Sequence, residues 1–297
     1  MKTTSLCLAS WLCLSAMPGF AADDGIFTIV EGTARVLRDT KWYKLAVGAR
    51  FQEGDLIEAN EKAQVQIELA KGGLLNLVGP ATVFAAPVPL RNDTLMGAIE
   101  FVLPRGWLKL AVNAADAGAR VRASVASVVL RGGVVVIHAE ASAFEAFVES
   151  GEMKLSEAGP GAKDGVPRDA KAGEYWARAA DRPFTTERRA PPAFVAAMPR
   201  HLIDPLPTLA AKYKGARVQL VVDRDITYAE AAPWATGPYR KMFVRRFQPR
   251  LQDREFRNAV DANIAHYPEW DRILHPEKYL PKTPPPAPAA APAVPAK

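Results

Sequence analysis

A run of cations in the last third of the sequence is the clearest candidate for binding chemistry. The cations are Arg240, Lys241, Arg245, Arg246 and Arg250. On one interpretation they form a patch for an anionic partner: a phosphate-bearing cell-wall polymer, lipid headgroups or an acidic protein. The other interpretation is an amphipathic helix with solvated charges, because Tyr239, Phe243 and Phe247 follow at i, i+4 and i+8 and would pack inward.

Aromatic residues in the same segment are the second candidate. The set most suited to a groove for a partner peptide or a glycan is Trp234, Tyr239, Phe243, Phe247 and Trp270. The alternative role of these rings is the core of a small helical domain.

Residues with catalytic potential are scattered. The histidines lack the short spacings of a zinc site and stand alone at His138, His201, His266 and His275. Asp55 follows Gly54 and suits a turn. Closely spaced acids occur at Asp223/Asp225 and Glu269/Asp271, where solvated charge is one interpretation and a catalytic pair the other. There is no nucleophile elbow, phosphate-binding loop or dinucleotide fingerprint. We therefore expect no catalytic residue, cofactor or metal ligand.

The elements upstream of these candidates are predicted to be strands. Apolar and polar residues alternate strictly from Ala63 to Leu69. This pattern predicts a strand, because the side chains of a strand point to opposite faces in turn and the apolar ones then share one face. A hairpin is predicted by the turn residues at 71–73 and the apolar Leu75 and Leu77 that follow. We expect one face of this hairpin to be exposed to solvent and the other to pack on the core. Turn signals recur every 8–12 residues, which is typical of an all-β sandwich or a short β-solenoid.

An ordered set of short motifs in this region resembles the FecR domain, a bacterial periplasmic β module. The motifs are Val30-x-Gly32, Trp42-x-x-Leu45-x-x-Gly48, Gly54-Asp55-x-Ile57, Ala63-x-Val65-x-Ile67-x-Leu69 and Gly79-Pro80-Ala81. The chain departs from the family at Ala59, where Thr is usual, and at 131–133, where a Gly-Thr pair is usual. The resemblance covers roughly residues 26–175 and implies a receptor-side sensing module. The family's cytoplasmic anti-sigma segment has no counterpart in the sequence, so we do not extend that role to this chain.

The N-terminus has the pattern of a secretory signal peptide. Lys2 precedes a short apolar stretch at 6–16, and Gly19 and Ala21 supply small residues at the −3 and −1 positions. Both cysteines, Cys7 and Cys13, fall inside this segment, so the mature chain would have no disulfide and no thiol site. These features predict a periplasmic protein without a transmembrane span in its mature chain.

Composition divides the rest of the chain. Residues 22–181 hold 18 Lys and Arg against 21 Asp and Glu, a net −3, whereas residues 182–282 hold 18 against 11, a net +7. Opposite charges favour docking of the two halves. The predicted organisation is a signal peptide (1–21), a FecR-like β domain (22–181), a linker (182–192), a smaller, basic, mostly helical domain (193–280) and a disordered Pro/Ala-rich tail (281–297).

Local signals predict particular elements within these parts. Pro104-Arg105-Gly106 is a break between two short strands. A short helix is expected at 207–213, and the apolar run at 218–222 predicts a strand or a buried extended segment. Thr227 and Glu230 have the spacing of a capping box ahead of a helix that Pro233 should end early, and Asp253 can cap a later helix.

Together these features predict an exported, non-catalytic FecR-domain protein that binds, signals or acts as a scaffold in the periplasm. The expected partner is a periplasmic or envelope protein or a cell-wall polymer, and export argues against nucleic acid. Two alternatives are an envelope-anchoring module that uses the cation run, and a hydrolase of envelope glycans with an unrecognised site.

Overall fold

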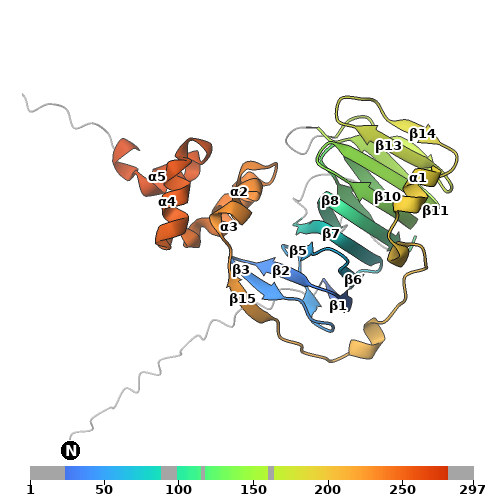
Figure 1. The fold of residues 1–297 in the computed structure, drawn as a ribbon, viewed down its shortest axis with the longest axis horizontal. Coiled ribbons are helices and arrows are strands. Elements are labelled where there is room, and N and C mark those ends of the chain that lie inside the picture. Colours follow the sequence, from blue (N-terminus) through green and yellow to red (C-terminus); the bar gives the residue numbers. More distant parts are fainter. Residues whose placement is uncertain (1–23, 88–98, 115–117, 160–163, 280–297) are drawn as a thin grey trace, which may run out of the picture.

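The computed structural model describes residues 24–87, 99–114, 118–159 and 164–279. Within these ranges the chain is mostly β-structure up to residue 187, and helices dominate after residue 227 (Figure 1). This confirms the predicted fold class, a mainly β N-terminal part followed by a smaller, mostly helical C-terminal part. The predicted signal peptide and the predicted tail lie outside the described residues.

The described strands form one sheet, whose main path runs β14-β13-β11-β10-β9-β8-β7-β5-β2-β3-β15. The short strands at its start are β1 (Gly25–Glu31), β2 (Ala34–Arg38), β3 (Lys41–Lys44), β4 (Arg50–Phe51), β5 (Leu56–Ala59) and β6 (Gln64–Leu69). The long central strands, with the short β9 among them, are β7 (Leu74–Ala86), β8 (Ile99–Val112), β9 (Ala119–Arg122), β10 (Ala126–Ala139) and β11 (Ala143–Glu157). The edge is completed by β12 (Arg168–Lys171), β13 (Tyr175–Ala179) and β14 (Thr185–Glu187).

The long strands bend near their middles, so the sheet folds around its own core. In β10, Val128 and Leu130 belong to the core before the bend, and Val135 and Ile137 after it. The core-facing positions change from even to odd numbers where the register with β11 shifts. Because both halves of β10 contribute to one apolar cluster, they face each other across it, as the two layers of a sandwich do.

Glycines make these bends possible. Gly106 has φ +109° and Gly133 has φ +117°, a region that favours glycine. A Cβ atom at Gly106 would lie 2.2 Å from the Cβ of Ala81, and one at Gly133 would lie 2.1 Å from the carbonyl oxygen of Ser150. The strands therefore approach too closely at the bends for any side chain.

The hairpin predicted between Ala63 and Leu77 is present as β6 and the first half of β7. The prediction that one face of the hairpin is exposed to solvent was wrong, because every residue of β6 is buried. Residues 199–210, which we call the strap, cover the polar side of this hairpin. Figure 1 shows the chain passing along the outside of the sheet from α1 (Pro192–Ala197) towards β15 (Val221–Asp225). The local alternation of β6 could not predict this burial, because the residues of the strap that cover it lie more than 120 positions later in the sequence.

The segment before the helical region returns to the sheet. β14 lies inside the predicted linker and pairs with β13. α1 (Pro192–Ala197) packs Phe194 against Trp107, with ring centroids 5.2 Å apart. η2 (Arg200–Leu202) follows, and the helix expected at 207–213 is only the 3-10 turn η3 (Ala210–Tyr213). The apolar run at 218–222 leads into β15 (Val221–Asp225), an exposed strand that pairs with β3 at the far edge.

Four helices complete the described chain: α2 (Tyr228–Thr236), α3 (Arg240–Phe247), α4 (Arg254–Ala262) and α5 (Pro268–Leu274). They are joined and followed by the 3-10 turns η4 (Gln248–Gln252), η5 (Ile264–His266) and η6 (Pro276–Tyr279). Thr227 and Glu230 form the predicted capping box of α2, and Asp253 caps α4 by accepting a hydrogen bond from the backbone N–H of Phe256. Pro233 was expected to end α2 early, but the helix continues to Thr236.

Packing explains both the persistence of α2 and the docking of the helical region. Ala231 and Ala235, on either side of Pro233, are buried in a second apolar core. That core joins the helices to Leu37, Trp42 and Phe84 of the sheet. The two parts of the chain are therefore in contact through apolar surface. Burial of this surface, more than the attraction between opposite net charges, stabilises the contact.

Candidate functional site

The structure separates the five cations that were predicted to form one patch. Arg240 pairs with Glu269, and Arg250 donates to a backbone carbonyl and pairs with acidic side chains. Lys241 and Arg245 are exposed, and they make no hydrogen bond or ion pair within the described part of the chain. Two cations of the five are thus left for an external anion.

Arg246 ties α3 to the sheet. Its guanidinium donates to the carbonyl oxygens of Leu37 at 2.7 Å, Asp39 at 2.8 Å and Gly54 at 2.7 Å. Burial lowers the pKa of Arg246 to about 10. This cation is therefore part of the contact between the two regions.

The structure also divides the five aromatic residues predicted to form a groove. Phe243, Phe247 and Trp270 are buried in the second core, as the alternative interpretation expected. Trp234 and Tyr239 are partly exposed and line a cavity.

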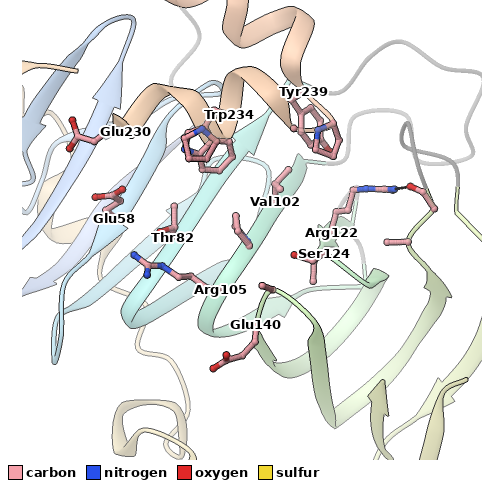
Figure 2. A pocket seen from close by; sticks show the side chains of 18 residues that line it. Glu58, Thr82, Val102, Arg105, Arg122, Ser124, Glu140, Glu230, Trp234 and Tyr239 are labelled. Atoms are coloured by element: carbon pink, nitrogen blue, oxygen red, sulfur yellow. Dashed lines mark hydrogen bonds between the residues drawn. The ribbon is translucent and has the colours of Figure 1, made fainter. Parts of the chain in front are cut away.

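This cavity, of about 610 Å³, lies between the sheet and the α2–α3 region (Figure 2). α2 and the turn after it supply Pro233 and Pro238 beside the two rings. The apolar contribution of the sheet comes from Val102, Pro104, Ala123, Ala141 and Ala158. A concave, largely apolar site with a few polar groups is typical of ligand binding.

The polar groups on the sheet side begin with Arg105, at the bend of β8. It is exposed, and its guanidinium makes no hydrogen bond or ion pair with the residues that the structure describes. Ser124 and Glu140 lie nearby on the rim, and Trp234 and Tyr239 lie across the cavity from these groups (Figure 2). Within the described ranges, Arg105 is therefore a cation at the cavity without an anion to neutralise it.

Two carboxylates meet at another wall of the cavity. One guanidinium nitrogen of Arg35 lies 2.8 Å from Glu58 and 2.8 Å from Glu230. Arg224 also binds Glu230, at 2.6 and 2.7 Å. Burial raises the pKa of Glu230, but the hydrogen bonds from Arg224 and Thr227 and the charge of Arg35 outweigh burial and hold that pKa well below its usual range. Glu230 therefore stays ionised at neutral pH.

Tyr239 holds the opposite wall. Its hydroxyl donates to Glu100, and a nitrogen of Arg120 lies 3.8 Å from the same carboxylate. Burial, with the adjacent charge of Glu100, raises the pKa of Tyr239 far above its usual value, so the hydroxyl remains a donor. Arg122, which also lines the cavity, pairs with Asp164.

The other side chains considered for catalysis lie elsewhere. None of the four histidines lines the cavity. His138 stacks on Trp107 with centroids 4.3 Å apart and lies 3.0 Å from Glu145, and His275 lies 2.6 Å from Asp261. Asp55 accepts a hydrogen bond from the N–H of Gln52, as a turn residue does, and also pairs with Arg38. The acids at Asp223/Asp225 and Glu269/Asp271 each face a basic side chain.

Sequence reasoning missed most of the cavity. Arg105 was seen only within a Pro-Arg-Gly break between strands, and Glu230 only as a helix cap. Ser124 and Glu140 carry no local signal, because they come together only when the strands bend. Among the described residues, no three His, Cys, Asp or Glu side chains gather as a metal site requires. No helix within the described ranges is long and apolar enough to cross a membrane.

Comparison with known proteins gives limited matches. No protein-family model matches the chain, and no curated protein does. Two crystal structures of a candidate anti-sigma factor from Parabacteroides distasonis are similar to it, at 14% and 13% identity and TM-scores of 0.37 and 0.36. Each match covers 45% of this chain and 59% of the other. The chain thus spans less than two thirds of the length of these structures.

Proposed function

We propose that this protein is an exported, non-catalytic binding protein of the cell envelope, and that it takes its ligand in the cavity between the sheet and α2. The observation that carries the proposal is the placement of Arg105, a cation without a partner among the described residues, across the cavity from Trp234 and Tyr239. A guanidinium binds carboxylates and phosphates, and aromatic rings accept sugars or apolar chain segments. The ligand class is therefore an anionic group on a peptide or glycan.

The proposal of binding in place of catalysis rests on charge. Two acidic groups that line the cavity, Glu58 and Glu230, are already neutralised by Arg35 and Arg224. Catalytic acids and bases need a pKa near the working pH. A Glu230 that stays ionised has no proton to give.

Signalling and periplasmic location are part of the same proposal. They rest on the signal-peptide pattern at 1–21 and on the motifs that resemble the FecR domain. The envelope-anchoring alternative has less support, because Arg240, Arg246 and Arg250 are engaged within the protein and only Lys241 and Arg245 stay available.

One observation favours a second candidate, a glycan hydrolase. Glu58 and Glu230 contact the same guanidinium nitrogen, so their carboxylates lie close together, as the two carboxylates of a retaining glycosidase do. This candidate requires that substrate binding displace Arg35 and raise one carboxyl pKa. Release of reducing sugar from soluble peptidoglycan, abolished by Glu58→Gln and by Glu230→Gln, would support it.

The binding proposal is tested by placing a photoreactive phenylalanine derivative at Ser124 in the full-length protein in cells. The control places it at Ile273, an exposed position on α5. We expect a discrete cross-linked species from Ser124 that is lost when Arg105 is changed to Ala and partly retained with Arg105→Lys. Identical products from both positions, or products indifferent to Arg105, would contradict the proposal. Mass spectrometry of the species separates a peptide from a glycan ligand.

A further inference from the structure

A row of polar side chains lies on the side of the sheet that the strap covers. Gln66 on β6 is opposite Asn76 on β7, and Asn76 is opposite Lys109 on β8. Glu68 lies two positions beyond Gln66 on the same face, and all four side chains are buried. None of them lines the cavity. A buried row of this kind needs hydrogen-bond partners.

The row obtains its partners from the backbone of the strap. Asn76 donates to the carbonyl of His201 at 3.2 Å. Lys109 donates to the carbonyls of Leu202 at 2.9 Å and Asp204 at 3.1 Å, and it also pairs with Glu149 at 2.9 Å.

The other two side chains of the row do the same further along the strap. Gln66 donates to the carbonyl of Pro207 at 2.8 Å, and Glu68 accepts from the N–H groups of Leu209 and, at 2.9 Å, Ala210. Because every contact between the row and the strap is to the main chain of the strap, the row recognises an extended backbone with little regard to its side chains.

The strap itself buries little apolar surface. Leu202 is buried, but Ile203 is 57% exposed and residues 204, 205, 207 and 208 are exposed as well. A segment held mainly by hydrogen bonds gains little net stability from each of them, because water replaces them on release. The strap therefore depends on polar contacts, four of them to the charged side chains of Lys109 and Glu68, and water can replace these contacts when it opens.

The strap also leaves part of the row without a partner. The side-chain oxygens of Gln66 and Asn76 are buried and accept no hydrogen bond from the described residues. Between its contacts with Lys109 at Asp204 and with Glu68 at Leu209, the strap contains Pro205 and Pro207, which have no N–H to donate. A buried acceptor without a donor is costly, so a backbone with N–H groups at these two places would bind better than the strap.

We propose that the polar row formed by Gln66, Glu68, Asn76 and Lys109 is a binding site for an extended segment of a partner protein, and that the strap is its exchangeable internal occupant. The partner segment has free N–H groups where the strap has Pro205 and Pro207. The site is independent of the cavity ligand, and it gives the protein a second, main-chain-directed binding surface.

Labelled peptides with the sequence of residues 199–212 test the proposal on the full-length protein. One carries Ala in place of Pro205 and Pro207, and its matched control carries N-methylalanine there, which has a methyl group in place of each of the two N–H donors. We expect the Ala peptide to bind at least about tenfold more tightly, as one added hydrogen bond predicts. Binding of neither peptide at millimolar concentration, or of both equally, would overturn the proposal.

Two protein variants locate the site. In Gln66→Met, which keeps size but removes the acceptor, the preference for the Ala peptide should fall several-fold; an unchanged preference places the peptide elsewhere and refutes the assignment. The second variant, Pro205→Ala with Pro207→Ala, leaves the row intact, so this test holds even if Gln66→Met fails to fold. It should tighten the strap and weaken Ala-peptide binding, whereas unchanged binding would argue against exchange.

Discussion

The helical region and the strap both cover the sheet, but they hold it in different ways. The helical region is joined through an apolar core in which Phe243 and Phe247 pack with Phe84, Leu37 and Trp42. The strap contributes Leu202 as its buried apolar side chain and otherwise relies on hydrogen bonds between its main chain and the side chains of the polar row.

The difference follows from how each kind of contact behaves in water. Buried apolar surface has no equivalent partner in solvent, so releasing the helical region costs the full hydrophobic term. Released hydrogen-bonding groups are solvated again, and the net cost per bond is small. We therefore expect the helical region to be a fixed part of the fold and the strap to open on its own. The predictions below test this contrast from the largest effect to the smallest.

The largest effect is expected for Phe243→Ala. Phe243 is fully buried, and its ring centroid lies 4.8 Å from that of Phe84 on the sheet. The substitution should lower the free energy of unfolding by about 3–5 kcal/mol, the usual cost of removing a buried phenylalanine. Chemical denaturation measures it. Lys241→Ala, at an exposed position two residues earlier on the same helix, is the control; a loss under about 1 kcal/mol for Phe243→Ala would mean that the second core is not what holds the two regions.

Arg246→Ala should have the next largest effect. It removes the donor for three carbonyl oxygens at the junction of α3 and the sheet, at an expected cost of about 2–3 kcal/mol. Arg245→Ala removes an equal charge from the adjacent, exposed position and should change stability by less than about 0.5 kcal/mol. Equal effects of the two substitutions would show that Arg246 acts only through its charge.

Glu230→Gln tests the ion pairs that join α2 to the sheet through Arg35. We expect a loss of about 1–2 kcal/mol at pH 7, because Arg35 and Arg224 lose an ionised partner. The folded pKa of Glu230 is depressed below the ordinary 4.5, so on acidification the unfolded chain takes up the proton first. The stabilisation is thus complete above about pH 4.5 and declines below it. Stability curves of the two proteins should converge below pH 4.5, and parallel curves would refute the depressed pKa.

The smallest effect on stability is expected for Lys241→Glu combined with Arg245→Glu. Both side chains are exposed and unpaired among the described residues, so unfolding should change by less than about 0.5 kcal/mol. Co-sedimentation with cell-wall polymer then tests the anchoring alternative directly. If the original protein binds the polymer in a salt-sensitive way and the double variant does not, the anchoring alternative is supported. If binding is unchanged in the variant, or absent from both proteins, Lys241 and Arg245 are not anchoring residues.

Local pattern was enough to predict much of the fold. The alternation at 63–69 specified β6, and the cap residues Thr227 and Asp253 specified the starts of α2 and α4. These signals succeed because hydrogen-bond capping and the alternation of a strand are decided within a few residues.

What the sequence did not predict depends on distant contacts. The polar face of β6 is covered by a strap more than 120 residues away, and Arg246 finds its acceptors in turns near residues 39 and 54. The prediction that the five aromatic residues form one groove was wrong for the same reason. A helix pattern shows that Phe243 and Tyr239 share one side, but only the position of the sheet decides that Phe243 is buried and Tyr239 lines a cavity.

Native-state hydrogen exchange of the full-length protein tests the contrast between the two covers most directly. The amides to follow are Leu209 and Ala210 of the strap, which donate to Glu68, and Val244 and Phe247 of α3. We expect the strap amides to exchange through a local opening several kcal/mol below global unfolding, and the α3 amides to exchange only with it. Exchange of both sets with the same free energy would contradict an independently opening strap.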